Sequence, residues 1–279
     1  MKNDTSKRVF PRFGDLLLIV ILFLLVQCAM LLILKAFGVE SPVEPKGVDV
    51  DPEIFMSYEE QLGRFNAVMY PVLMFFSIVT IWLYARLRGG KGVVSIKHSI
   101  AGFNPSVILV GVLWLVSSQI LIEPLTTMMP ASDGSSIGRG VWAWITALAF
   151  APIFEELLCR GVLLSVVRRR WGVVAAIVVS ALFFGLIHFE MSTALVAFVA
   201  GLIFGVIYVR TSSIFSTMII HSINNLLAFS MVCFGMGEKS WQDVLGGGVV
   251  YYIVYGVAAL IFLAASIEAY FKVIRRQKS

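Results

Sequence analysis

The sequence predicts an all-α protein whose helices cross a membrane several times. Of its 279 residues, 59% are hydrophobic and only 14% are charged, and the mean hydropathy is +0.90. This composition lies outside the range of soluble globular domains. A backbone exposed to lipid must satisfy its own hydrogen bonds, so we expect every span to be a helix.

Apolar runs long enough to cross a hydrocarbon core of about 30 Å recur along the chain. Several carry no charge, and three further spans contain isolated polar side chains. Together they predict about eight transmembrane helices, at residues 15–36, 66–86, 104–124, 141–166, 172–190, 192–210, 213–235 and 247–270. The proline-containing segment 37–65 is expected to be an extended outer loop.

Basic residues orient the bundle, because short cytoplasmic loops collect Lys and Arg. With both termini in the cytoplasm, 16 of the 22 Lys and Arg lie inside: four before residue 15, four in 86–97, three in 168–170, Arg210, and four after residue 271. Five lie outside, and Arg160 lies within a span. The basic pI near 9.2 therefore belongs to the inner face, and we expect no nucleic-acid binding.

The chain has no recognisable internal repeat, and we treat it as one membrane domain with three parts. Residues 1–140 form an N-terminal three-helix region that includes the outer loop. Residues 141–235 form a four-helix core that carries polar side chains, and 236–279 form the last helix and a basic tail. The three cysteines show no paired spacing and imply no disulfide framework.

Ionisable groups inside an apolar span are the first sign of a functional site. The stretch PIFEELLCRG contains Glu155, Glu156 and Arg160. Each charge at mid-membrane costs roughly 2.5–3.5 kcal/mol even on lenient insertion scales. Glu156 and Arg160 are four residues apart on a helix and can pair. Glu155 points about 100° away from Glu156 and needs another partner.

Two other predicted spans carry polar groups that could meet Glu155. The stretch FFGLIHF contains Phe184 and His188, and HSINN contains His221 and Asn225. A rise of about 1.5 Å per residue from the inner-surface arginines puts these groups at similar depths. We therefore expect three helices to bring their polar side chains together near the middle of the bilayer.

Three motifs in this order resemble a known family. They are E-E-x-x-x-R at Glu155, Glu156 and Arg160, F-x-x-x-H at Phe184 and His188, and H-x-x-x-N at His221 and Asn225. They look like the signature motifs of the CAAX prenyl endopeptidase and bacteriocin-processing (CPBP, or Abi) intramembrane proteases. The resemblance covers roughly residues 141–235, and the other helices carry no motif that we can assign.

The resemblance implies an intramembrane endopeptidase that hydrolyses a membrane-associated protein or peptide, either a lipidated CAAX-like protein or a bacteriocin-like peptide. By resemblance, Glu155 activates a water with help from His188, and His221 and Asn225 bind the oxyanion. Arg160 pairs with Glu156 in support, and Phe184 completes its motif. No cofactor is needed in this interpretation. A zinc site with Glu155, His188 and His221 as ligands is the alternative.

Other interpretations stay open at this point. A buried Glu–Arg pair or a single intramembrane histidine often only holds a bundle together, but the joint occurrence of three motifs favours a site. A non-proteolytic immunity or scaffold protein of the same fold is one functional alternative. An ion-coupled transporter is less favoured, because the polar cluster occupies one half of the chain. Small residues at 201–205 predict close helix packing.

The predicted location is a bacterial plasma membrane, with the site opening to the cytoplasm. The short loops and the basic inner face favour this location. The sequence does not predict the oligomeric state.

Overall fold

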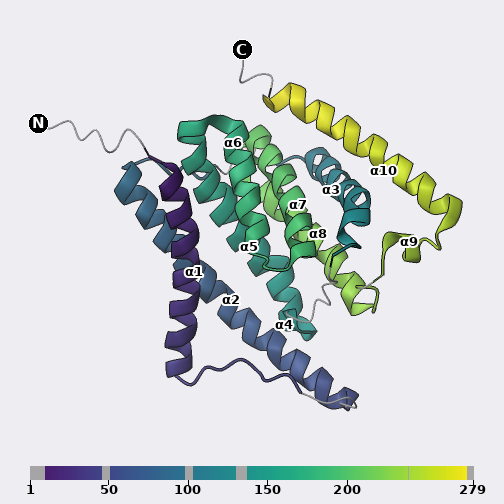
Figure 1. The fold of residues 1–279 in the computed structure, drawn as a ribbon, viewed down its shortest axis with the longest axis horizontal. Helices are drawn as coiled ribbons and strands as arrows, with labels where there is room; N and C mark the ends of the chain where they lie inside the picture. Colours follow the sequence, from purple (N-terminus) through teal and green to yellow (C-terminus); the bar gives the residue numbers. More distant parts are fainter. Residues whose placement is uncertain (1–9, 46–50, 98–102, 130–136, 238, 275–279) are drawn as a thin grey trace, which may run out of the picture.

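The structure, a computed structural model, describes residues 10–45, 51–97, 103–129, 137–237 and 239–274, which form a bundle of helices without any strand (Figure 1). The predicted all-α membrane fold is confirmed. The elements are α1 (Phe13–Ala36), α2 (Pro52–Gly89), α3 (Pro105–Thr126), α4 (Gly140–Ile145), α5 (Ala151–Glu156), α6 (Leu164–Leu186), α7 (Met191–Thr211), α8 (Ile214–Cys233), α9 (Trp241–Val244) and α10 (Gly248–Ala269). π-Helical segments follow α4 (Thr146–Phe150), α5 (Leu157–Leu163) and α10 (Tyr270–Ile274).

Six helices of the described residues are long and apolar enough to cross a membrane: α1, α2, α3, α7, α8 and α10 with its extension. The other two predicted spans, 141–166 and 172–190, fall in one helical stretch from α4 to α6. That stretch turns at Gly172, whose φ of 78° and ψ of −175° are not helical. A positive φ is readily adopted by glycine, so Gly172 permits the reversal after three arginines.

The prediction of an extended outer loop at 37–65 is wrong for its second half. Helix α2 already begins at Pro52, 14 residues before the predicted span at 66–86. The Asp51 side chain caps it by accepting a hydrogen bond from the backbone N–H of Glu53, at 2.9 Å. Proline is favoured in the first turn because its missing N–H would have no helical partner there. The part of α2 that is predicted to cross the lipid thus continues a helix that begins before the predicted span.

Segments predicted to be cytoplasmic meet at one end of the bundle. At the end of α2, Tyr84 donates a hydrogen bond of 2.5 Å to Asp15 at the start of α1, and Arg88 lies 3.3 Å from the same carboxylate. At the end of α7, Arg210 pairs with Glu268 of α10 at 2.9 Å. This end is uppermost in Figure 1. The termini at 1–9 and 275–279 lie outside the described residues, and the orientation in the membrane stays a prediction.

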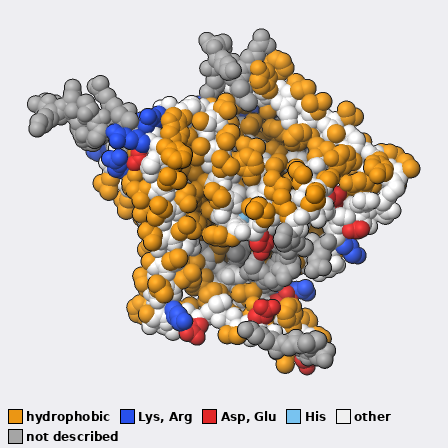
Figure 2. All heavy atoms as spheres, viewed as in Figure 1, with side chains coloured by type: hydrophobic (Ala, Val, Ile, Leu, Met, Phe, Trp, Pro, Cys, Tyr) orange, Lys and Arg blue, Asp and Glu red, His pale blue; other side chains and the backbone are white. Residues whose placement is uncertain are grey.

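Helices α6 and α7 pack closely at the centre of the bundle. A Cβ added to Gly201 would lie 2.9 Å from the Cα of Ala181, and one added to Gly205 would lie 3.0 Å from Ile177. The predicted role of the small residues at 201–205 is confirmed. Outer helices present apolar side chains to the surroundings, as Figure 2 shows over much of one face, and most of the Lys and Arg in this view lie toward its edges.

Candidate active site

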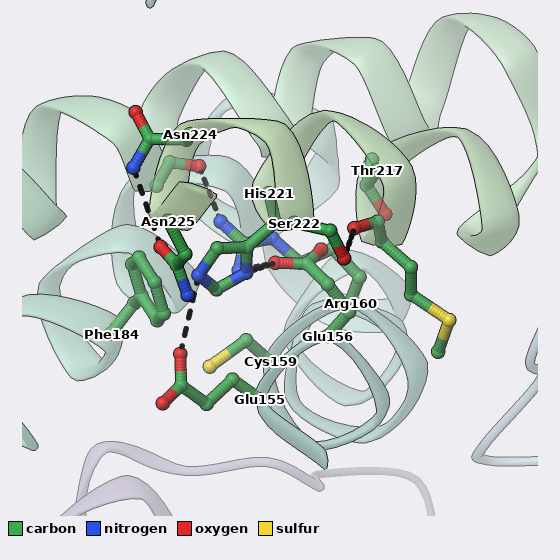
Figure 3. Close-up of polar contacts among 12 residues, drawn as sticks. Glu155, Glu156, Cys159, Arg160, Phe184, Thr217, His221, Ser222, Asn224 and Asn225 are labelled. Atoms are coloured by element: carbon green, nitrogen blue, oxygen red, sulfur yellow. Dashed lines mark hydrogen bonds and ion pairs between the residues drawn. The ribbon is translucent and has the colours of Figure 1, made fainter. Parts of the chain in front are cut away.

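The candidate site is built on α5, which π-helical segments flank on both sides. A π-helical turn contains an extra residue relative to α-helix and changes which side chains face a neighbouring element. Glu155 and Glu156 are the last residues of α5, and both side chains are buried against α8 (Figure 3). These carboxylates are thereby held inside the bundle rather than at its lipid-facing surface.

Arg160 and Glu156 form the predicted ion pair. Both are fully buried, and Arg160 Nη1 lies 2.8 Å from Glu156 Oε1. Arg160 Nη2 donates to the carbonyl of Gly201 on α7 at 2.9 Å. The guanidinium also lies over the rings of Phe184 and Phe204, 4.9 and 5.1 Å from their centroids. Charge pairing, a carbonyl and two aromatic faces together offset the loss of hydration.

His221 lies between the two carboxylates. Its Nε2 is 3.6 Å from Glu155 Oε2, and its Nδ1 is 3.4 Å from Glu156 Oε1. The ring stacks on Phe204 with an interplanar angle of 28° and meets Phe184 edge-on. These nitrogen–oxygen separations are longer than those of good hydrogen bonds. His221 is therefore held mainly by ring packing, and its nitrogens remain able to bind another group.

Glu155 receives a hydrogen bond that the sequence motifs do not reveal. Tyr70 of α2 donates to Glu155 Oε1 at 2.5 Å. Glu155 is 7% exposed. One of its carboxylate oxygens is bound by the phenol, and the other faces His221. The only signal for Tyr70 in the sequence is an aromatic residue with a polar tip inside a predicted span, which is common in membrane helices.

Asn225 follows His221 by one helical turn on α8. Its Nδ2 donates to the carbonyl of Ala147 at 2.9 Å, and the neighbouring Ser222 donates to the carbonyl of Leu148 at 2.7 Å. Both carbonyls belong to the first π-helical segment, which thus holds α8 in register. A side-chain amide nitrogen has two hydrogens, so the second N–H of Asn225 is available to a substrate.

His188 lies beyond the end of α6 rather than inside a helix. The predicted span 172–190 includes it, whereas α6 ends at Leu186 and His188 is in the turn before α7. Its Nδ1 is 2.7 Å from the carbonyl oxygen of Phe184, and its ring packs edge-on against the Phe184 ring. A carbonyl only accepts, so Nδ1 carries the hydrogen of this bond. The Phe184 ring contacts both site histidines.

The zinc alternative does not fit the arrangement of its proposed ligands. Wherever the structure describes the chain, no three His, Cys, Asp or Glu side chains form a group that could hold a metal. Glu155 and His221 are close, but His188 does not join them. We therefore derive no step through a metal.

Comparison with protein families assigns this part of the chain. Residues 137–227 match the family model described as Type II CAAX prenyl endopeptidase Rce1-like. All seven residues of the three motifs lie in this range, and Tyr70 lies outside it. No curated protein and no solved structure matches the chain. The resemblance to the CPBP family is therefore confirmed for the part of the chain that carries the site.

Proposed function

From the premise that residues 137–227 form an Rce1-like domain of the CPBP family, we propose that the protein hydrolyses peptide bonds inside the membrane with a water activated by Glu155. The observation that carries the proposal is the buried cluster of Glu155, Glu156, Arg160 and His221. Ionisable groups in a membrane bundle are costly, and their convergence in a dry site is typical of function.

The first step is attack by water on the scissile carbonyl. A water beside Glu155 Oε2 gives its proton to the carboxylate while its oxygen bonds to the carbonyl carbon. The family resemblance also assigns His188 to this water, but the described contacts of His188 are with Phe184 and not with Glu155, so the proposed step rests on Glu155. A carboxylate with one oxygen free and directed into the site suits the role of general base.

The second step is collapse of the tetrahedral intermediate. Its oxyanion would accept hydrogen bonds from His221 and from the second N–H of Asn225, one turn apart on α8. The carbon–nitrogen bond then breaks, and Glu155 passes its proton to the leaving nitrogen. In this proposal the Glu156–Arg160 pair touches no reacting atom and keeps α5, α7 and His221 in place.

The proposed substrate is a membrane-associated protein or peptide, lipidated or bacteriocin-like. The family description supports a lipidated C-terminal segment as the first class to test. The clustering of Arg88, Arg170 and Arg210 at one end of the bundle supports a cytoplasmic position of that end. The proposal retains a bacterial plasma membrane and an opening of the site toward the cytoplasm.

A comparison of membranes tests this function while the substrate is still unidentified. Host cells that lack the gene for this protein are complemented with wild type or with Glu155→Gln, expressed at equal levels. The termini of membrane-associated proteins and peptides in the two cell lines are then mapped by mass spectrometry. We expect at least one uncleaved form to accumulate with Glu155→Gln and a new terminus with wild type. Identical termini in both samples, together with full biological activity of the variant, would instead support the non-proteolytic immunity or scaffold role.

A further inference from the structure

Helix α2 brings a tyrosine to the candidate site from outside the Rce1-like domain. Tyr70 is partly buried, and its Oη lies 2.5 Å from Glu155 Oε1. Close contacts of α2 with α5 and with both π-helical segments around it support this position. Ala67 and Met74, which flank Tyr70 on α2, are buried. The phenol therefore approaches Glu155 from a packed helix rather than from a loop.

The phenol distinguishes the two oxygens of Glu155. Oε1 is bound by Tyr70, whereas Oε2 faces His221 at 3.6 Å. Among the residues that the structure describes, Tyr70 provides the only hydrogen bond to the Glu155 side chain. Without this bond, rotation of the terminal carboxylate torsion, which is broad, would exchange the two oxygens.

A second tyrosine on α2 shows what a purely structural bond of this kind looks like. Tyr84 donates to Asp15 Oδ1 at the same distance of 2.5 Å. Asp15 also accepts from the backbone N–H of Arg12 at 2.6 Å and lies 3.3 Å from Arg88. Several donors thus hold Asp15, and the loss of one leaves the others. Glu155 has no such reserve among its described neighbours.

We infer that Tyr70 is a positioning residue of the active site, which binds Glu155 Oε1 so that Oε2 is directed at the attacking water. This inference rests on the proposed function. Tyr70 thereby keeps Glu155 correctly rotated, and α2 becomes part of the active site although the family match does not include it.

Kinetics of two matched variants test the inference. Four proteins are reconstituted in phosphatidylethanolamine–phosphatidylglycerol vesicles: wild type, Tyr70→Phe, Tyr84→Phe and Glu155→Gln. The substrate is a farnesylated, fluorescence-quenched peptide that ends in a CAAX sequence. We expect Tyr70→Phe to lower kcat about 10- to 100-fold with KM nearly unchanged, as for a misplaced catalytic base. Tyr84→Phe should keep wild-type kcat, because it removes an equivalent bond far from the site.

Labelling of Glu155 by dicyclohexylcarbodiimide, quantified by mass spectrometry, gives a readout that needs no substrate. The reagent bonds to a carboxyl oxygen, and the Tyr70 hydroxyl occupies Oε1 of Glu155, so loss of the phenol leaves that oxygen open to the reagent. We expect Glu155 to be labelled faster in Tyr70→Phe than in wild type and Tyr84→Phe, at equal thermal stability of the two tyrosine variants. Unchanged labelling in Tyr70→Phe would overturn the inference.

The outcomes separate this inference from the proposed function. If wild type cleaves the peptide, Glu155→Gln is inactive and Tyr70→Phe turns over normally, the role of Tyr70 is wrong and the function stands. If Glu155→Gln cleaves as well as wild type, the proposed function is wrong. If wild type leaves the peptide intact, the labelling comparison alone decides whether Tyr70 controls Glu155.

Discussion

Two buried carboxylate sites in this protein differ in how completely they are bonded. Glu123, near the end of α3, is 6% exposed and has a protein donor on each oxygen. The backbone N–H of Trp241 donates to Oε1, and Tyr251 donates to Oε2 at 3.0 Å. These bonds tie α3 to α9 and α10. Glu123 therefore has the complete set of partners expected of a structural anchor.

The cluster around α5 is incompletely bonded by comparison. Glu156 Oε2, Arg160 Nε and His221 Nδ1 are buried atoms that have no hydrogen-bond partner among the described residues. An unsatisfied buried polar group costs about 1–3 kcal/mol, and native proteins retain few of them. Their concentration beside Glu155 indicates that this region is arranged for a substrate or water rather than for stability alone.

The largest expected effect on stability comes from the buried ion pair. Arg160→Ala leaves Glu156 without its partner inside the bundle, and should destabilise the protein by about 3–5 kcal/mol and lower its activity. Arg64→Ala is the matched control, since Arg64 and Glu60 form an exposed pair at 3.8 Å with the same spacing of four residues. That variant should change stability by less than about 1 kcal/mol. Thermal unfolding in detergent measures both, and equal midpoints would contradict the difference between the sites.

The next effect concerns turnover rather than stability. Asn225→Ala removes one proposed oxyanion donor and should lower kcat about 10²- to 10³-fold while KM changes little. Asn224→Ala is the control, because Asn224 is the adjacent amide and has no proposed catalytic role. Its Oδ1 accepts a hydrogen bond from Gln119 Nε2 at 2.6 Å, and its Nδ2 donates to Asn225 Oδ1 at 3.5 Å. Equal turnover of the two variants would remove Asn225 from the mechanism.

His221→Ala separates the proposed glutamate mechanism from the zinc alternative. In the proposal it loses turnover as Asn225→Ala does, and chelators leave the wild type active. In the zinc alternative, purified wild type contains about one equivalent of metal and the variant loses it. Metal analysis of both preparations therefore decides between them.

A smaller effect is expected at the helix contact behind Arg160. Gly201→Ala adds a methyl group 2.9 Å from the Cα of Ala181, and overpacking of this kind costs about 1–3 kcal/mol. Gly256→Ala is the control, because a Cβ there meets nothing within 4 Å. Thermal unfolding measures both variants. Equal midpoints for Gly201→Ala and Gly256→Ala would contradict the predicted overpacking between α6 and α7.

Hydropathy predicted most helices well because lipid exposure requires long apolar runs. The start of α2 at Pro52 was missed, although Asp51 and Pro52 form a recognisable helix start. The prediction followed apolar length, and this part of the helix is polar. The π-helical segments around α5 could not be foreseen, since side-chain patterns over five to seven residues do not separate π- from α-helix.

The candidate site was predictable where its residues are unusual for a membrane helix. Glu155, Glu156, Arg160 and His221 were recognised because charge in a span needs a partner, and the structure brings these four together. Tyr70 was missed because tyrosine in a span is ordinary, and its position depends on the packing of α2 against α5. The place of His188 depends on where α6 ends, which hydropathy does not define to within a turn.

The most direct test compares the same substitution in both buried carboxylate sites. Glu155→Gln and Glu123→Gln each replace a buried carboxylate by an amide of nearly the same shape, and turnover is measured for both in the same proteoliposomes. Glu155→Gln should lower kcat about 10²- to 10⁴-fold with little change in thermal stability, because an amide cannot accept the proton of the attacking water. Glu123→Gln should instead lower thermal stability and keep kcat near that of wild type. Near-normal turnover by Glu155→Gln would contradict the assignment of Glu155 as the base.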